Sequence, residues 1–137
     1  MPGQSALYLA EDHATAFAEY MQDLDRPGLF TPYHVEAKHI VDLCDPNVRA
    51  DLGAEETTLL SGWKRAARIE RREPPTWTIA ASLLASGADG VRVPSAQRVR
   101  GVNLVLWRWN TKGAARVAVL DPLGDLPRDR RSWEVDD

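Results

Sequence analysis

Residues 87–107 hold two strand-like runs on either side of a proline and a serine, and this segment constrains the fold of the chain most. It reads GADGVRVPSAQRVRGVNLVLW. Gly87 and Gly90 allow the backbone to turn tightly before a short apolar run, and Pro94 stiffens the end of that run. The next residue, Ser95, therefore has a defined position at a strand end, where we expect its hydroxyl to line a ligand pocket.

The other patterns alternate between strands and helices along the chain. Alternating apolar and polar residues and short apolar runs predict strands at 6–10, 33–43, 91–93, 102–109 and 116–121. Apolar spacings of three and four predict helical segments at 13–25, 45–53 and 75–87. We expect Asp12 and Asp45 to cap the first two and Gly87 to close the third. The last two strands are expected to pair through a turn at 110–113, whereas residues 54–73 show no clear pattern.

These elements predict a mixed α+β fold of about five strands and about three or four helices. We expect a single domain over residues 1–137, with a charged tail at 126–137. A length of 137 residues fits one domain, and 44% hydrophobic with 27% charged residues is typical of globular proteins. No apolar run approaches the ~20 residues that span a bilayer, so we expect no membrane partner.

Cysteine usage and the start of the chain indicate a reducing compartment. Cys44 is the only cysteine, which excludes an internal disulfide. The opening MPGQSALYLAED lacks the basic and apolar regions of a secretory signal, so we expect a cytoplasmic protein. His34 and His39 would lie on opposite faces of a strand, and with His13 and Cys44 they show no metal-ligand spacing. We therefore expect no metal.

Residues 63–73 carry a run of basic residues, for which three interpretations stand. The five basic positions are Lys64, Arg65, Arg68, Arg71 and Arg72. They could bind nucleic acid, dock an acidic partner or belong to a solvated helix. Glu70 and Glu73 dilute the charge and favour the solvated helix. The net charge of −3 also argues against a nucleic-acid partner.

Three blocks of the sequence resemble the RES domain, a family of small bacterial toxins. The first, ALYLAEDHATAFAEY, is similar to the family's strand-helix opening and contains Tyr8, Thr15-Ala16 and Glu19. The second, IAASLLASGADGVRVPS, is similar to its helix, turn and short strand ending in a serine, here Ser95. The third, GVNLVLW, is similar to the strand that follows and contains Asn103. The blocks lie in the family's order.

The resemblance implies a fold, a substrate and a partner. It implies an ADP-ribosyltransferase-like split sheet, mixed or antiparallel and flanked by helices, with NAD bound as substrate in a cleft. It implies cleavage of the bond between nicotinamide and ribose, and a protein antitoxin that covers the cleft. The NAD-binding residues expected from the matched blocks and their neighbours are Tyr8, Arg92, Ser95, Arg98 and Asn103.

The chemistry of this cleavage suggests a role for each catalytic candidate. The departing nicotinamide leaves an oxocarbenium-like charge on the ribose, which a nearby carboxylate stabilises, and Glu19 is the candidate. An aromatic ring can stack on the nicotinamide or ribose, as we expect of Tyr8. A fixed hydroxyl such as that of Ser95 can hold a ribose hydroxyl or the carboxamide. Taken singly, the three residues are more typical of a solvated helix position, a core tyrosine and a turn serine, and only their joint match favours a site.

One departure from the family keeps an alternative open. The family's arginine stands about ten residues before its tyrosine, a spacing that the resemblance supplies, and no arginine lies among the seven residues ahead of Tyr8. Arg92, Arg98 or Arg100 are expected to lend the positive charge instead. The alternative is a catalytically inactive RES-fold module that binds a partner. A nucleic-acid-binding domain using residues 63–73 ranks third.

Overall fold

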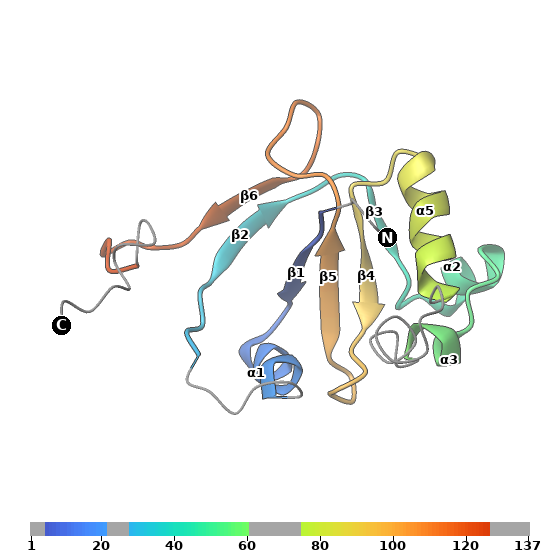
Figure 1. Cartoon of the computed structure of the whole chain (residues 1–137), viewed down its shortest axis with the longest axis horizontal. Coiled ribbons are helices and arrows are strands. Elements are labelled where there is room, and N and C mark those ends of the chain that lie inside the picture. The colour runs from blue at the N-terminus through green and yellow to red at the C-terminus, as the bar shows by residue number, and fades with distance from the viewer. Residues whose placement is uncertain (1–4, 22–27, 61–74, 127–137) are drawn as a thin grey trace.

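The computed structural model describes residues 5–21, 28–60 and 75–126 of the chain. Within these ranges, six strands form two sheets with four helices around them (Figure 1). The predicted α+β class is confirmed, and the larger sheet combines parallel and antiparallel pairs. The basic run at 63–73 and the tail from residue 127 onward lie outside the described residues.

The larger sheet has four strands in the order β1-β5-β4-β3. Their bounds are Leu7–Ala10 for β1, Ile40–Asp42 for β3, Gly90–Pro94 for β4 and Val102–Leu106 for β5. β5 is antiparallel to both of its neighbours, β1 and β4, whereas β3 runs parallel to β4. The strands of the three sequence blocks, β1, β4 and β5, therefore lie side by side in one sheet, with β5 between the other two.

The predicted single strand at 33–43 is wrong, because this segment forms two strands in different sheets. β2 Tyr33–Glu36 pairs antiparallel with β6 Arg116–Val119 in a sheet of two strands. β3 belongs to the larger sheet, and residues 37–39 lie outside both strands. The break coincides with His39-Ile40, where the alternation of apolar and polar residues in the sequence is interrupted.

A backbone contact explains why the chain changes sheets here. The His39 carbonyl accepts a hydrogen bond from the Asp89 amide at 2.8 Å. That bond brings Ile40 into register with Gly90, the first residue of β4. Parallel pairing with a strand so distant in sequence leaves no local signal, so the alternation pattern predicts one continuous strand.

The predicted hairpin between 102–109 and 116–121 is also wrong. Both edges of β5 are occupied by β1 and β4, so β6 pairs with β2 instead. The chain leaves β5 after residue 106, and an isolated bridge joins Trp109 and Ala115 beyond the strand end. The turn brings the chain to the second sheet.

The four described helices are α1 His13–Met21, α2 Pro46–Asp51, α3 Glu56–Leu59 and α5 Pro75–Ala85. For the helix predicted at 13–25, residues 22–25 lie outside the described part of the chain. The start of α2 is confirmed, because the Asp45 carboxylate accepts the Asn47 amide at 2.8 Å as an N-cap. None of the described helices is long and apolar enough to cross a membrane.

Gly87 ends α5 as the sequence predicts. Its φ of 90° is a left-handed conformation that glycine adopts without a steric penalty. The Gly87 amide bonds the Leu84 carbonyl and the Ala88 amide bonds the Leu83 carbonyl, each at 3.1 Å. This pair of bonds is the Schellman motif, and it directs the chain from α5 into β4.

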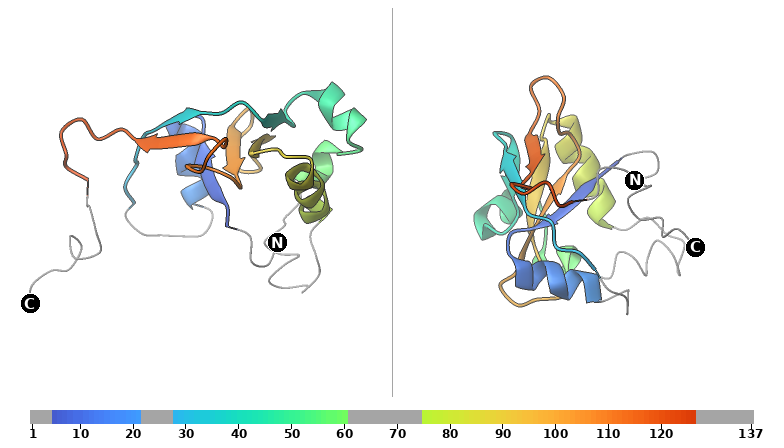
Figure 2. Two further views of the ribbon diagram at one scale, coloured as in Figure 1. Left: turned by 90° about the horizontal axis from the view of Figure 1, so that it is seen from above. Right: turned by 90° about the vertical axis from the view of Figure 1, so that its left-hand side faces the viewer.

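The hydrophobic core lies between α5 and one face of the larger sheet. α5 lies along one side of this sheet (Figure 2), and Val48 of α2 and Leu59 of α3 also pack against the core. The buried residues of the core are Leu43, Leu83, Ala88, Val91, Val105 and Trp107. On the other face of β5, Leu106 is fully buried. A Cβ on its partner Gly90 would stand 2.2 Å from the Val105 carbonyl oxygen, so the strands can approach this closely only at a glycine.

Candidate active site

The carboxylate of Glu19 lies where helix α1 meets the ends of β4 and β5. Figure 1 shows α1 across the end of the sheet, beside the loop between these strands. Glu19 Oε1 accepts hydrogen bonds from Ser95 Oγ at 2.7 Å and from Asn103 Nδ2 at 2.6 Å. The structure thus brings together three predicted site residues from the three sequence blocks. We call Glu19, Ser95 and Asn103 the carboxylate cluster.

Ser95 is both a turn serine and a member of the carboxylate cluster. Its side chain is buried, and its Oγ accepts the amide N–H groups of Gln97 and Arg98, each at 3.1 Å. The Ser95 amide also donates to the Gly101 carbonyl at 2.8 Å, which closes the loop. With two donors already bound to it, the hydroxyl is oriented to donate its proton to Glu19.

Asn103 and Tyr8 lie on the same face of the sheet. Asn103 is opposite Ala10 of β1, and Tyr8 stands two residues before Ala10 on that strand. Side chains two residues apart on a strand share a face. The Tyr8 side chain is 61% exposed, so it is not a core tyrosine. Partial burial raises the pKa of Tyr8 above its ordinary value, because desolvation disfavours the charged phenolate.

Arg98 lies beside the carboxylate cluster but is engaged by the start of α1. Its Nη1 is 3.3 Å from both carboxylate oxygens of Asp12 and 3.2 Å from Thr15 Oγ1. Its backbone amide is one of the two donors to Ser95. Arg98 therefore connects the serine loop to the helix that carries Glu19.

Arg92, also predicted to bind NAD, is not brought together with the carboxylate cluster. It is opposite Leu104 on β5, and adjacent residues of a strand point to opposite faces, so Arg92 faces away from Asn103. Its guanidinium binds the carboxylates of Glu11 and Asp42. The hydrogen bond to Glu11 raises the pKa of Arg92 above its ordinary value. Arg92 thus ties together the ends of β1, β3 and β4.

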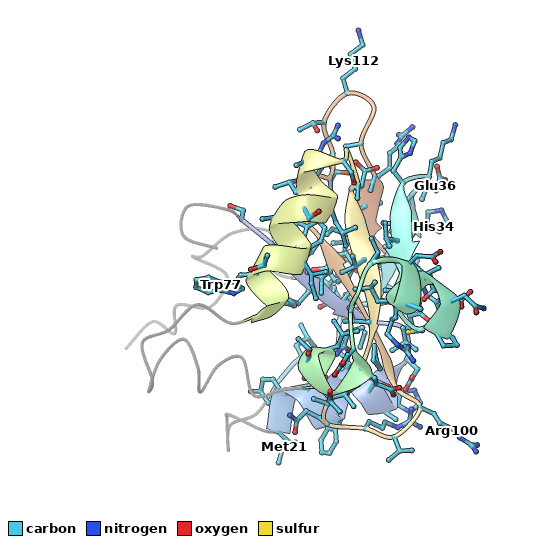
Figure 3. The ribbon with its side chains drawn as sticks, turned by 90° about the vertical axis from the view of Figure 1, so that its right-hand side faces the viewer. Met21, His34, Glu36, Trp77, Arg100 and Lys112 are labelled. Carbon is cyan, nitrogen blue, oxygen red and sulfur yellow. The ribbon has the colours of Figure 1, made fainter. Side chains whose placement is uncertain are left out.

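Arg100, the third arginine suggested as a substitute for the family's arginine, points away from the body of the molecule (Figure 3). Its φ of 63° is unusual for a residue with a side chain and marks a tight turn just before Gly101. No described hydrogen bond joins the Arg100 side chain to the carboxylate cluster.

Two residues that position the site were missed by the sequence analysis. Thr15 is fully buried, and a Cβ on Gly101 would stand only 2.7 Å from Thr15 Oγ1. The missed signal in the sequence is that Thr15 and Glu19 are four residues apart and so share a side of α1. Asp12, expected only as the helix cap, accepts both the amide and the hydroxyl of Thr15, at 2.9 and 2.8 Å.

Other reactive side chains do not form a second site in the described part of the chain. There, no three histidine, cysteine or acidic residues gather in a way that could hold a metal ion, and the expected absence of a metal stays a prediction. Burial raises the pKa of the Cys44 thiol, which disfavours the reactive thiolate.

The titration of Asp12 tests the geometry at the start of α1. The Thr15 amide, and then the Thr15 hydroxyl, hold the pKa of Asp12 below its ordinary value, and the charge of Arg98 acts in the same direction. Because the folded-state pKa is the lower one, Asp12 adds stability above its unfolded pKa of about 3.9. This contribution is lost as the pH falls through the folded-state pKa.

We predict that Thr15→Val, which removes the hydroxyl and keeps the volume, raises the pKa of Asp12 toward its ordinary value. Carboxyl ¹³C NMR of Asp12 during an acid titration of both proteins measures this change. An Asp12 that titrates at the ordinary value in the unaltered protein, or at the same pH in both, would contradict the described hydrogen bonds.

Comparison with known proteins places the chain in a family. A model of the RES domain family matches residues 1–129. None of the curated proteins compared with the chain matches it, and neither does any solved structure. The likeness to ADP-ribosyltransferases and the NAD-binding cleft therefore stay predictions. Since the match covers the carboxylate cluster and both sheets, the chain belongs to the RES domain family.

Proposed function

We propose that this protein cleaves the bond between nicotinamide and ribose in NAD, as a toxin-like enzyme. The observation that carries the proposal is the carboxylate cluster, in which Ser95 and Asn103 both donate to one oxygen of Glu19. The exposed ring of Tyr8 lies on the same sheet face as Asn103. Membership of the RES domain family supports the same reaction.

The cleavage needs a fixed negative charge beside the ribose. When the bond from C1′ to the nicotinamide nitrogen breaks, its electron pair neutralises the pyridinium ring, and positive charge develops on the ribose. A carboxylate that is already oriented stabilises this charge without reorganising. The oxygen of an acceptor then bonds to C1′ and releases its proton. Water, phosphate or a protein side chain are the acceptor classes, and the product is ADP-ribose or its conjugate.

Each residue has a distinct part in this reaction. Glu19 stabilises the charge on the ribose, while the hydrogen bonds from Ser95 and Asn103 hold its carboxylate in one orientation. The Ser95 hydroxyl is buried and already makes three hydrogen bonds, so we assign it to orienting Glu19 rather than to binding a ribose hydroxyl directly. Tyr8 offers an exposed ring on which the nicotinamide or ribose can stack. We place the reaction in the cytoplasm, where NAD is abundant.

Incubation with NAD tests the function directly, with free nicotinamide measured by liquid chromatography. We expect release by the full natural chain and a loss of at least about 100-fold in Glu19→Gln, because the amide carries no charge to stabilise the ribose. Glu36→Gln is the matched control, since Glu36 is exposed and pairs with His34 on β2. It should leave the rate unchanged.

Two results would contradict the proposal. Release that persists in Glu19→Gln would refute the role of Glu19. No release by the full natural chain would refute the enzyme and favour the alternative, a RES-fold module that binds a partner without catalysis.

We also propose a protein partner, the antitoxin implied by the family resemblance, that covers an apolar surface beside the site. Phe17 and Met21 of α1 are exposed, as are Leu29 and Phe30 of the next described segment. The rings of Phe17 and Phe30 lie 6.4 Å apart, so the surface is continuous between the two segments. Exposed apolar patches of this kind mark interaction sites. Phe17 and Glu19 are two residues apart and so project about 200° apart around α1. A partner bound to this surface would therefore act on the site by shifting α1, and Glu19 with it, rather than by covering the substrate.

A photocrosslinking amino acid tests this surface in the cells that make the protein. Placed at Phe17, it should form an adduct with one protein, and that protein once purified should stop nicotinamide release. The control position is Lys112, on the loop at the opposite end of the molecule from Met21 (Figure 3). Equal labelling at both positions, or none at Phe17, would contradict the proposed surface.

A further inference from the structure

We propose that Arg98, Thr15 and Gly101 are positioning residues that set where the Glu19 carboxylate stands. With Asp12 they form a group that we call the α1 clasp, which fastens the start of α1 to the loop between β4 and β5. The inference rests on the proposed function for its catalytic consequence. It also changes the role predicted for Arg98, from a ligand of NAD to a residue that acts through Glu19.

The approach of Thr15 to Gly101 leaves no room for a side chain at position 101. Thr15 Oγ1 occupies the space that a side chain at position 101 would need, 2.7 Å from the place of its Cβ. Thr15 Cγ2 would lie 3.0 Å from the same point. Since Thr15 and Glu19 are four residues apart on one side of α1, this contact sets how near Glu19 comes to the loop. Any side chain at position 101 would push the helix outward.

Arg98 fastens the same two elements by charge and hydrogen bonding. Its Nη1 lies 3.3 Å from both carboxylate oxygens of Asp12 and 3.2 Å from the Thr15 hydroxyl. In the loop, the Arg98 carbonyl accepts the Gly101 amide at 3.0 Å, and the Arg98 amide donates to Ser95 Oγ. One residue thus contacts both the cap of α1 and the hydroxyl that binds Glu19.

The clasp and the carboxylate cluster are two consecutive contacts between the same elements. The 2.7 Å hydrogen bond between Ser95 and Glu19 can form only while α1 keeps its place against the loop. A shift of about 1 Å in a catalytic group can lower a rate about 100-fold. Loosening the clasp should therefore reduce catalysis even though Thr15 is fully buried and cannot touch the substrate.

Steady-state kinetics separate positioning from substrate binding. A residue that binds NAD equally in ground and transition states changes KM when removed, whereas a residue that positions Glu19 changes kcat. We expect Arg98→Ala and Gly101→Ala to lower kcat about 10- to 100-fold, with KM within about twofold of the unaltered protein. Arg98→Lys should restore part of the rate because it retains a charge beside Asp12.

A double variant at Thr15 and Gly101 gives a second, more specific test of the same contact. Thr15→Ala removes the two nearest atoms that a Cβ at position 101 would meet and leaves Arg98 Cβ, at 3.1 Å, as the next nearest. Gly101→Ala should therefore cost less in the Thr15→Ala background than in the unaltered protein. Circular dichroism confirms that each variant is folded. The double variant keeps the test decisive if Gly101→Ala alone is unstable.

An NMR readout distinguishes failure of the clasp from failure of the enzyme. The side-chain amide of Asn103 reports its hydrogen bond to Glu19 at 2.6 Å. Its proton signal should move upfield in Arg98→Ala and in Gly101→Ala, whether or not NAD is cleaved. An unchanged chemical shift of this amide proton in both variants would contradict the proposed role of the α1 clasp. A raised KM with an unchanged kcat in Arg98→Ala would also contradict this role, and would indicate that Arg98 binds NAD directly.

Discussion

The seating of helix α1 against the loop between β4 and β5 is the contact on which the candidate site depends. It joins segments 76 and 84 residues apart through two hydrogen bonds to a single carboxylate oxygen. Glu19 is only partly buried, and these donors replace the part of its hydration that it gives up beside the loop. The fold supplies them from the end of β4 and the start of β5.

Two requirements of the fold meet at this contact. The sheet brings β4 and β5 together as antiparallel neighbours, so that Ser95 and Asn103 lie close to each other. Helix α1 can approach the loop this closely only where the loop residue opposite Thr15 has no side chain, and that residue is Gly101. Ser95 also closes its own loop by accepting two amides. Ser95 therefore has a structural role in its loop and a proposed catalytic role beside Glu19. The hydrogen bonds of the structural role fix the position of its hydroxyl.

Local chemistry made much of the fold predictable, whereas pairing over long distances did not. The caps at Asp12 and Asp45 and the stop at Gly87 depend on neighbouring residues, and the structure has all three. The division of 33–43 between two sheets and the neighbours of β5 depend on distant strands.

The candidate site divides in the same way. The sequence blocks predicted that Glu19 and Ser95 meet, whereas Asn103 was expected to bind NAD and its hydrogen bond to Glu19 was not predicted. Alternation along β4 already places Arg92 and Ser95, three residues apart, on opposite faces, and in the structure Arg92 binds Glu11 and Asp42 instead of joining the group. The approach of Thr15 to Gly101 has no signal in either local sequence.

The most direct test of this account is a double-mutant cycle between Glu19 and Asn103, with stability measured by chemical denaturation. Glu19→Ala, Asn103→Ala and the double variant give the energy of the contact itself. The account predicts a coupling of about 0.5–3 kcal/mol, the range for residues in one hydrogen-bond network. Single effects that add to within about 0.5 kcal/mol would contradict it, because the carboxylate and the amide would then not hold each other in place.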